Sequence, residues 1–213
     1  MSEHVSFDLQ PVLKGALVEL RPLRADDCAA LYAVAADPLI WEQHHMQHRH
    51  EEEAFKDFFH EQLASGGALL AIDAQTGDVV GMSRFHGYHE KRSEIEIGWT
   101  FLARSHWGGV YNREMKGLML RHAFRFVRSV VFLVDPQNLR SRRAIEKIGA
   151  VQVGSRLDGG GHQSIAYQIE PLRRRPALGR LPGCRCNLER WFGRRLSNRP
   201  SSGSCPPRRA GSS

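Results

Sequence analysis

Apolar and polar residues alternate along some short segments of the chain and recur at helical spacing along others. Residues 16–23 alternate like a strand. Residues 25–38 then show the apolar spacing of a helix that begins at Asp26 or Asp27, and residues 38–65 predict one or two further helices. The first third of the chain is therefore predicted to form one strand followed by helices.

Three strand-like segments come next, at residues 68–74, 78–88 and 93–102. Gly77 lies in a short polar turn between the first two segments. Because the connections are short, we expect these three strands to form an antiparallel meander.

Helical and strand-like patterns alternate in the second half of the chain. Apolar spacing predicts a helix over residues 112–127, a buried strand follows at 129–135, and a short helix spans 138–150. Residues 150–170 predict a hairpin that turns at a run of glycines. Together these elements predict an α+β (mixed α/β) domain, with a largely antiparallel twisted sheet of about seven strands and a strand–helix–strand unit near its middle.

The composition adds an expected location to this picture. The chain has 213 residues, of which 41% are hydrophobic and 25% charged, as expected for one globular domain of modest size. Its N-terminal region has no basic start followed by an apolar stretch, so we expect neither a signal peptide nor a membrane span. With few cysteines in the domain, a reducing cytoplasmic setting fits.

The positive charge is concentrated at one end. Residues 171–213 carry eleven arginines, no lysine and one acid, a net charge of +10. Because the whole chain has a net charge of +7, residues 1–170 carry −3. We therefore divide the chain into an N-terminal segment (1–15), a domain (16–170) and an Arg/Pro-rich tail (171–213) that is expected to be disordered. The tail's charge could support non-specific nucleic-acid binding.

The loop HWGGVYNREMK joins the strand at residues 93–102 to the next helix. Gly108 and Gly109 stand in it between Trp107 and Tyr111. Glycines at a strand-to-helix junction can let backbone amides approach a phosphate closely, although they can also mark only a turn. A second motif, NLRSRRAIEKIGA, begins at Asn138 after the buried strand.

These two motifs, at this separation, resemble those of the GCN5-related N-acetyltransferase (GNAT) superfamily, in the branch that includes the ribosomal-protein alanine acetyltransferases. The resemblance covers residues 16–170, and the second motif matches at Asn138, Ser141, Glu146, Lys147 and Gly149. The chain departs from the family pattern at four positions. In the loop, Val110 stands where glycine is usual and Asn112 where glycine or alanine is usual. In the second motif, Ile145 replaces the usual tyrosine and Ala150 the usual phenylalanine.

The resemblance implies a GNAT-like fold with a central coenzyme A site, acetyl-CoA as co-substrate and no metal. The loop from Arg104 to Asn112 would hold the pyrophosphate with its backbone amides, at a helix N-terminus that favours an anion. The implied cofactor-binding residues are Phe101, Leu102, Trp107, Gly108, Gly109, Val110, Tyr111, Asn112, Asn138 and Ser141. Trp107 has an alternative role as a packing residue only.

Acetyl transfer to an amine needs a group that takes a proton from the amine. Strand alternation places Glu94 and Glu96 on the face that carries Gly98. Glu96 lies nearer the point where relatives splay two strands apart, so we favour it as a base acting through a water. The alternative is that both glutamates only face solvent.

Ser141 and Asn138 are the remaining catalytic candidates, each with a structural alternative. Ser141 is expected to bond the coenzyme sulfur or its pantetheine arm, and with Ile145 in place of tyrosine, Ser141 or water would protonate the thiolate. Ser141 could instead face solvent, and Asn138 fits a helix N-cap.

Two groups of charged or titratable side chains are expected to have no catalytic role. We expect solvated side chains at Arg140, Arg142 and Arg143, one of which could reach the 3′-phosphate of coenzyme A. The cluster at His44, His45, His48 and His50 is interpreted as a polar face near the acceptor rather than a metal site.

The sequence thus predicts an acetyl-CoA-dependent N-acetyltransferase that acts on a primary amine, either a peptide N-terminus or a small-molecule amine, by direct attack in a ternary complex. It is expected to be a cytoplasmic monomer or homodimer with no membrane partner. The alternative is a catalytically silent acyl-CoA-binding module, tethered to nucleic acid by the basic tail.

Overall fold

The computed structural model of the chain describes residues 6–158 and 160–171. The chain divides into a unit at Met1–Leu172 and a unit at Arg173–Ser213, and all described residues lie in the first. The tail, with its expected disorder and nucleic-acid binding, therefore lies outside the described residues.

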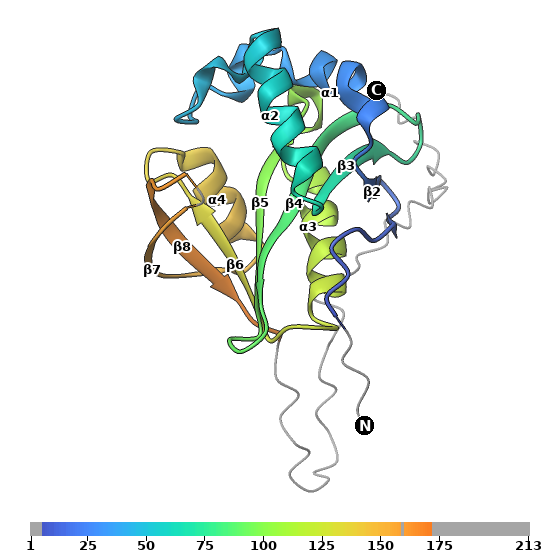
Figure 1. Ribbon diagram of the computed structural model, residues 1–213. Helices are drawn as coiled ribbons and strands as arrows, with labels where there is room; N and C mark the ends of the chain where they lie inside the picture. Colours follow the sequence, from blue (N-terminus) through green and yellow to red (C-terminus); the bar gives the residue numbers. More distant parts are fainter. Residues whose placement is uncertain (1–5, 159, 172–213) are drawn as a thin grey trace, which may run out of the picture. The chain divides into compact units, whose positions relative to one another are not determined.

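One sheet of eight strands, in the order β1-β2-β3-β4-β5-β6-β8-β7, runs through the described part of the chain (Figure 1). The strands are β1 (Leu13–Lys14), β2 (Val18–Pro22), β3 (Ala68–Asp73), β4 (Val79–His89), β5 (Glu94–Leu102), β6 (Ser129–Val134), β7 (Val151–Leu157) and β8 (Gln163–Ile169). Neighbouring strands are antiparallel except β5 and β6, which are parallel. This arrangement confirms the predicted mixed fold.

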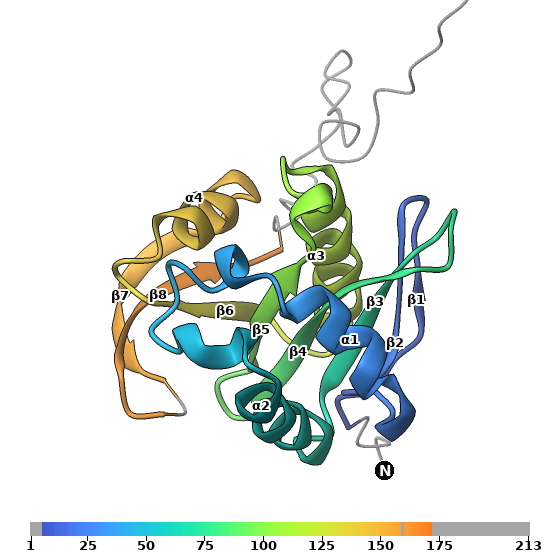
Figure 2. The ribbon, with the colours of Figure 1, turned by 90° about the horizontal axis from the view of Figure 1, so that it is seen from above.

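Helices cover both faces of the sheet, with α1 and α2 on one face and α3 and α4 on the other (Figure 2). The α-helices are α1 (Cys28–Ala35), α2 (Glu52–Ala64), α3 (Val110–Ala123) and α4 (Leu139–Lys147), and the 3-10 turns are η1 (Ala25–Asp27), η2 (Pro38–Ile40), η3 (Gln47–His50) and η4 (Arg104–His106). In this described part, no helix is both long and apolar enough to cross a membrane.

The hydrophobic core has two parts, one on each face of the sheet. Met115 of α3 and Ile145 of α4 pack with Phe132 on one face. On the other face, Phe55 and Phe58 of α2 pack with residues of β3 and β4. Burial of apolar surface on both faces holds the central strands in place, and these strands position the site described below.

Two features of the fold differ from the pattern-based expectation. The sheet gains β1, and Phe7 before it is buried in the core, 5.0 Å from the ring of Phe126. Helix α3 spans Val110–Ala123 rather than 112–127, because Gly109, with φ of 115°, caps its start. Beyond its end, the amides of Arg128 and Ser129 bond to Ser93, which leads the chain into β6.

Candidate functional site

Strands β5 and β6 separate along their length. They pair only over three positions, the last of which joins Glu96 to Val131. Both strands continue beyond this point, β5 to Leu102 and β6 to Val134. Figure 1 shows the two strands diverging from their common end, so the sheet opens between them. Glu96 therefore lies where the opening begins.

A β-bulge follows Glu96 on β5. Gly98 pairs with Arg84 and Phe101 with Met82, so two residues of β5 oppose one of β4. Trp99 within this bulge has φ of 50°, a conformation that costs free energy for a bulky residue. The bulge adds a local bend and twist to β5 beside the opening.

The Glu96 side chain occupies a poorly solvated position over Gly98. A Cβ at position 98 would lie 3.0 Å from Glu96 Oε1, so the glycine makes room for the carboxylate. Loss of solvation on burial raises the pKa of Glu96 to about 7, although the nearby positive charge of Arg84 lowers it in part. A carboxylate with this pKa exchanges protons readily at neutral pH.

Glu94 has a different environment from Glu96. Its two carboxylate oxygens accept hydrogen bonds from Arg156 Nη1 and Nη2, at 2.7 and 3.2 Å. This bidentate pair occupies Glu94, whose side chain is almost fully buried. The alternative in which both glutamates only face solvent is therefore wrong for Glu94, and Glu96 is half-buried.

Arg84 is a buried cation beside Glu96 that the sequence analysis did not single out. Its guanidinium lies 3.7 Å from the centre of the Trp99 ring and donates hydrogen bonds to Gln62 and His86. Burial lowers the pKa of Arg84. A charged residue in the otherwise uncharged segment of residues 79–85 was the sequence signal that could have identified it.

The Gly-Gly loop ends β5 and begins α3, as the sequence predicted. Gly108 and Gly109 have φ of 102° and 115°, which only glycine adopts without strain, and no atom lies within 4 Å of a Cβ built on either. No side chain caps this helix end, so the first amides of α3 lack an intrahelical partner. This geometry suits a phosphate group in the open space before the helix.

Trp107 contacts the chain itself through both its ring and its ring nitrogen. Its Nε1 donates a hydrogen bond to the Leu102 carbonyl at 2.9 Å, and the Arg140 guanidinium lies 4.2 Å from its ring centre. Arg140 also donates to the carbonyls of Leu39 and Ile40. The expectation that Arg140 is solvated is therefore wrong, because it joins α4 to η2.

Arg142 is not free in solvent either. Its Nε donates to the Tyr167 hydroxyl at 3.1 Å and its Nη1 to the Pro136 carbonyl at 3.3 Å. Arg143 is exposed, as expected.

The other predicted cofactor contacts fall into two groups. Phe101 and Leu102 have buried side chains that belong to the two halves of the core, so only their backbone could face the opening. At the start of α3, Val110 is exposed and Asn112 half-buried, while the Tyr111 hydroxyl donates to Asp73 at 2.6 Å.

Asn138 caps α4, as one of its two predicted roles required. Its Oδ1 accepts a hydrogen bond from the Ser141 amide at 3.0 Å. Ser141 is half-buried in the first turn of α4. Ile145 one turn later packs into the core, so the residue that replaces the family's tyrosine serves stability.

The segment between α1 and α2 covers the other side of the site. Burial lowers the pKa of His44 to about 3, so its imidazole is neutral at pH 7. A pocket of about 270 Å³ lies on this segment and α2, and its lining includes His45, Arg49 and Glu61. Glu61 also contacts Arg84, which connects this pocket to the surroundings of Glu96.

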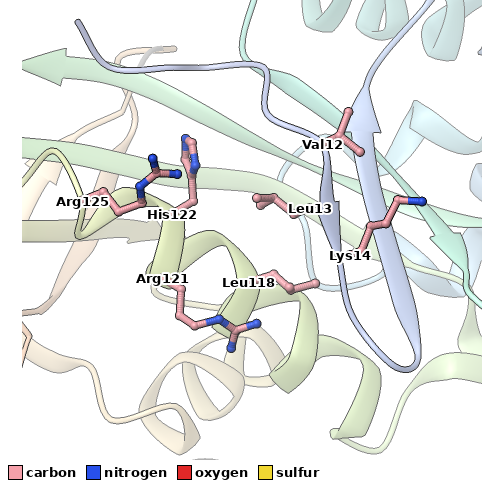
Figure 3. A pocket seen from close by; sticks show the side chains of 7 residues that line it. All are labelled: Val12, Leu13, Lys14, Leu118, Arg121, His122 and Arg125. Carbon is pink, nitrogen blue, oxygen red and sulfur yellow. The ribbon is translucent and has the colours of Figure 1, made fainter. Parts of the chain in front are cut away.

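A second pocket, of about 280 Å³, lies between β1 and α3 (Figure 3). Its lining includes Lys14, Arg121 and Arg125 and contains none of the predicted site residues. We therefore do not assign the chemistry of the site to this pocket.

Lys116 is a buried cation that helical spacing alone did not reveal. Its Nζ donates to Ser83 Oγ at 3.1 Å and to Thr100 Oγ1, so α3 is tied to the β5 bulge. Burial lowers the pKa of Lys116 to about 7. Lys116 thus fixes the position of the bulge from the face of the sheet opposite α2.

Comparison with known proteins decides the family. A family model described as an acetyltransferase (GNAT) domain matches residues 18–151, more than half of the chain. The chain belongs to the GNAT acetyltransferase family. No curated protein matches the sequence. The family assignment makes the protein an acyltransferase that uses acetyl-CoA.

Solved structures of GNAT proteins share this fold. A GCN5-related N-acetyltransferase from Brucella melitensis is 19% identical, with a TM-score of 0.67 over 76% of this chain and 79% of that one. An acetyltransferase from Agrobacterium tumefaciens is 23% identical, with a TM-score of 0.61 over 80% and 99% of the two chains. Mycobacterium smegmatis RimJ, solved in complex with CoA-disulfide, is 21% identical, with a TM-score of 0.56 over 72% and 82%.

Proposed function

We propose that this GNAT protein is an N-acetyltransferase that transfers the acetyl group of acetyl-CoA to a primary amine, by direct attack in a ternary complex. The amine is a peptide N-terminus or a small-molecule amine, and the protein acts in the cytoplasm. The observation that supports this most is Glu96, whose pKa is about 7 and which lies where β5 and β6 separate.

In this proposal Glu96 is the general base. A lysine-like amine has a pKa of about 10.4 and an α-amine one of about 7.7–8.0, so both are largely protonated at neutral pH. Glu96 accepts the proton through a water as the amine nitrogen bonds to the acyl carbon. Glu94 is unsuited to this role, because Arg156 occupies both of its oxygens.

The acyl donor is held by the Gly-Gly loop and the start of α3. The amides of Gly108, Gly109 and the first helical turn bind the pyrophosphate, and the β5 backbone at Phe101 and Leu102 lines the opening beside it. Acetyl-CoA supplies the thioester carbonyl that the amine attacks. Residues Trp107, Val110, Tyr111 and Asn112 shape this loop without contributing a proton.

Ser141 or a water protonates the departing thiolate in this proposal. Asn138 positions Ser141 through the cap of α4. Two tyrosine hydroxyls are engaged within the protein, since that of Tyr111 bonds to Asp73 and that of Tyr167 to Glu146.

The acceptor enters beside α2 and the segment before it. The 270 Å³ pocket there has two acids, Asp57 and Glu61, and one cation, Arg49, in its lining. The two carboxylates attract a protonated amine, and Arg49 offsets one of their charges. Glu96 then receives the proton at the end of the acceptor's path.

Release of coenzyme A from acetyl-CoA, measured with a panel of acceptors, tests the proposal. The panel pairs each free amine with its N-acetylated counterpart and covers a peptide with a free N-terminus, an amino acid and a polyamine. We expect turnover with at least one free amine and none with its blocked counterpart. Tight acetyl-CoA binding without turnover on any free amine would instead indicate an acyl-CoA-binding module.

A further inference from the structure

Three side chains of metal-binding type gather beside the α1–α2 connection from distant parts of the sequence. His45 lies between η2 and η3, whereas Asp158 and His162 flank the β7–β8 turn. One ligand atom of each lies within 4.8 Å of the ligand atoms of the other two. The histidine-rich segment at residues 44–50 therefore contributes one ligand, and the turn contributes the others.

The spacing of these groups approaches that of a coordination shell. Zinc bonds of about 2.0–2.2 Å in a tetrahedron place neighbouring ligand atoms about 3.3–3.6 Å apart. His162 Nδ1 lies 3.6 Å from Asp158 Oδ1, and the imidazole centres of His45 and His162 are 4.5 Å apart. Small side-chain rotations would thus bring the three ligands around one ion.

The chain holds these side chains in place through its own contacts. Asp158 Oδ1 accepts hydrogen bonds from the amides of Gly160 and His162, both at 2.9 Å. A carboxylate has about four lone-pair sites, so these bonds leave capacity for a cation. The His45 ring stacks on His44 with centres 4.5 Å apart. Such preorganisation reduces the entropy that binding costs.

The donor set selects the kind of ion. Two imidazoles and one carboxylate suit Zn²⁺ and its transition-metal neighbours, whereas Ca²⁺ and Mg²⁺ prefer oxygen ligands throughout. Asp135, with Oδ2 3.6 Å from His45 Nδ1, lies beside the cluster and can orient that ring.

We propose that His45, Asp158 and His162 bind one Zn²⁺ ion that joins the α1–α2 connection to the β7–β8 turn. Three protein ligands leave a fourth position for water. This site lies beyond the proposed acetyl transfer and does not depend on it, since its test needs no turnover.

Calorimetric titration of ZnCl₂ into metal-free, untagged, full-length protein at neutral pH tests the site. We expect one Zn²⁺ per chain. Replacing a residue that only hydrogen-bonds a metal ligand typically lowers metal affinity roughly 10–100-fold, and His162→Gln, which removes a ligand, should lower the Zn²⁺ affinity by more than that. His48→Gln is the matched control, because His48 lies on the same segment as His45 but outside the cluster. It should bind Zn²⁺ as the parent protein does.

The cysteines of the tail require a second control, because thiolates also bind Zn²⁺. A full-length variant with Cys184, Cys186 and Cys205 replaced by serine should retain the binding. The proposal is overturned if the parent protein binds no Zn²⁺, if the serine variant loses it, or if His48→Gln weakens binding as much as His162→Gln. Thermal melts of each variant confirm that it is folded.

Discussion

Glu96 carries a carboxylate in surroundings that favour its neutral form. Its folded-state pKa of about 7 lies above the roughly 4.3 of an unfolded chain, so the folded protein holds this proton more tightly. The resulting contribution to stability is present below pH 4 and is lost as the pH rises through 7. Catalytic sites commonly carry such a cost in stability. The poor solvation that raises the pKa of a carboxylate to a value useful at neutral pH also destabilises its charged form in the folded protein.

Glu96→Gln should therefore raise the melting temperature at pH 8, and the gain should shrink at pH 5, where Glu96 is largely protonated. Glu94→Gln is the control on the same strand and should lower the melting temperature at pH 8, since it breaks the bidentate pair with Arg156. Thermal melts at the two pH values measure both effects. A Glu96→Gln variant less stable than the parent at pH 8 would show that the carboxylate is well solvated or ion-paired.

At the scale of elements, the site depends on how β5, β6 and α3 meet. The opening between the strands and the start of α3, where no side chain caps the helix, lie at the same end of β5, with the Gly-Gly loop between them. The positive φ of Gly108 and Gly109 keeps side chains out of the space in front of the helix. This arrangement is where we expect acetyl-CoA to bind.

Acetyl-CoA should raise the melting temperature of the protein, because a ligand that binds only the folded state stabilises it. Gly108→Val should abolish most of that shift by placing a side chain in the phosphate site. Gly77→Val is the matched control, since Gly77 has φ of 80° and open space around it but lies in the β3–β4 turn. It should lower stability yet keep the shift. An equal loss of the shift in both variants would remove the loop from the site.

Periodicity predicted the elements well because it reports which side of a strand or helix is buried. Alternation in residues 93–102 was enough to place β5, and Asn138 after a buried strand was enough to place the α4 cap. The surroundings of a side chain that are formed by distant segments of the chain were not predictable in this way. Arg140 was expected in solvent, yet it bonds to carbonyls about a hundred residues earlier in the chain.

The raised pKa of Glu96 belongs to the same class, because burial by other parts of the chain raises it, while Arg84 and Arg156 on other strands lower it in part. Spacing along β5 identifies the residue but not its solvation. The metal-type cluster was likewise beyond the sequence pattern, since His45 lies more than a hundred residues before Asp158 and His162.

At the scale of the whole molecule, the family match and the core lie before the basic tail. The match covers residues 18–151, and the last buried core residue of the described part is Ile169. The tail carries a net charge of +10 without apolar periodicity. Acetyl transfer and the tail's charge are therefore expected to be separable.

A protein truncated after Glu170 should still fold and show the acetyl-CoA-induced rise in melting temperature. Any affinity of the full chain for nucleic acid should be absent from the truncated protein and should fall steeply with salt in the full chain. Thermal melts and a salt series of binding titrations measure the two. Insolubility of the truncated protein would show that the tail contributes to the fold.

The central claim is that Glu96 takes a proton from the acceptor amine, and the pH dependence of kcat tests it most directly. We expect the ratio of kcat for the parent protein to kcat for Glu96→Gln to rise about tenfold per pH unit below 7, as Glu96 ionises, and to level off above it at about 10²–10⁴. Acetyl-CoA binding should be unchanged. A ratio near one at every pH, with turnover intact, would contradict the assignment of Glu96 as the base.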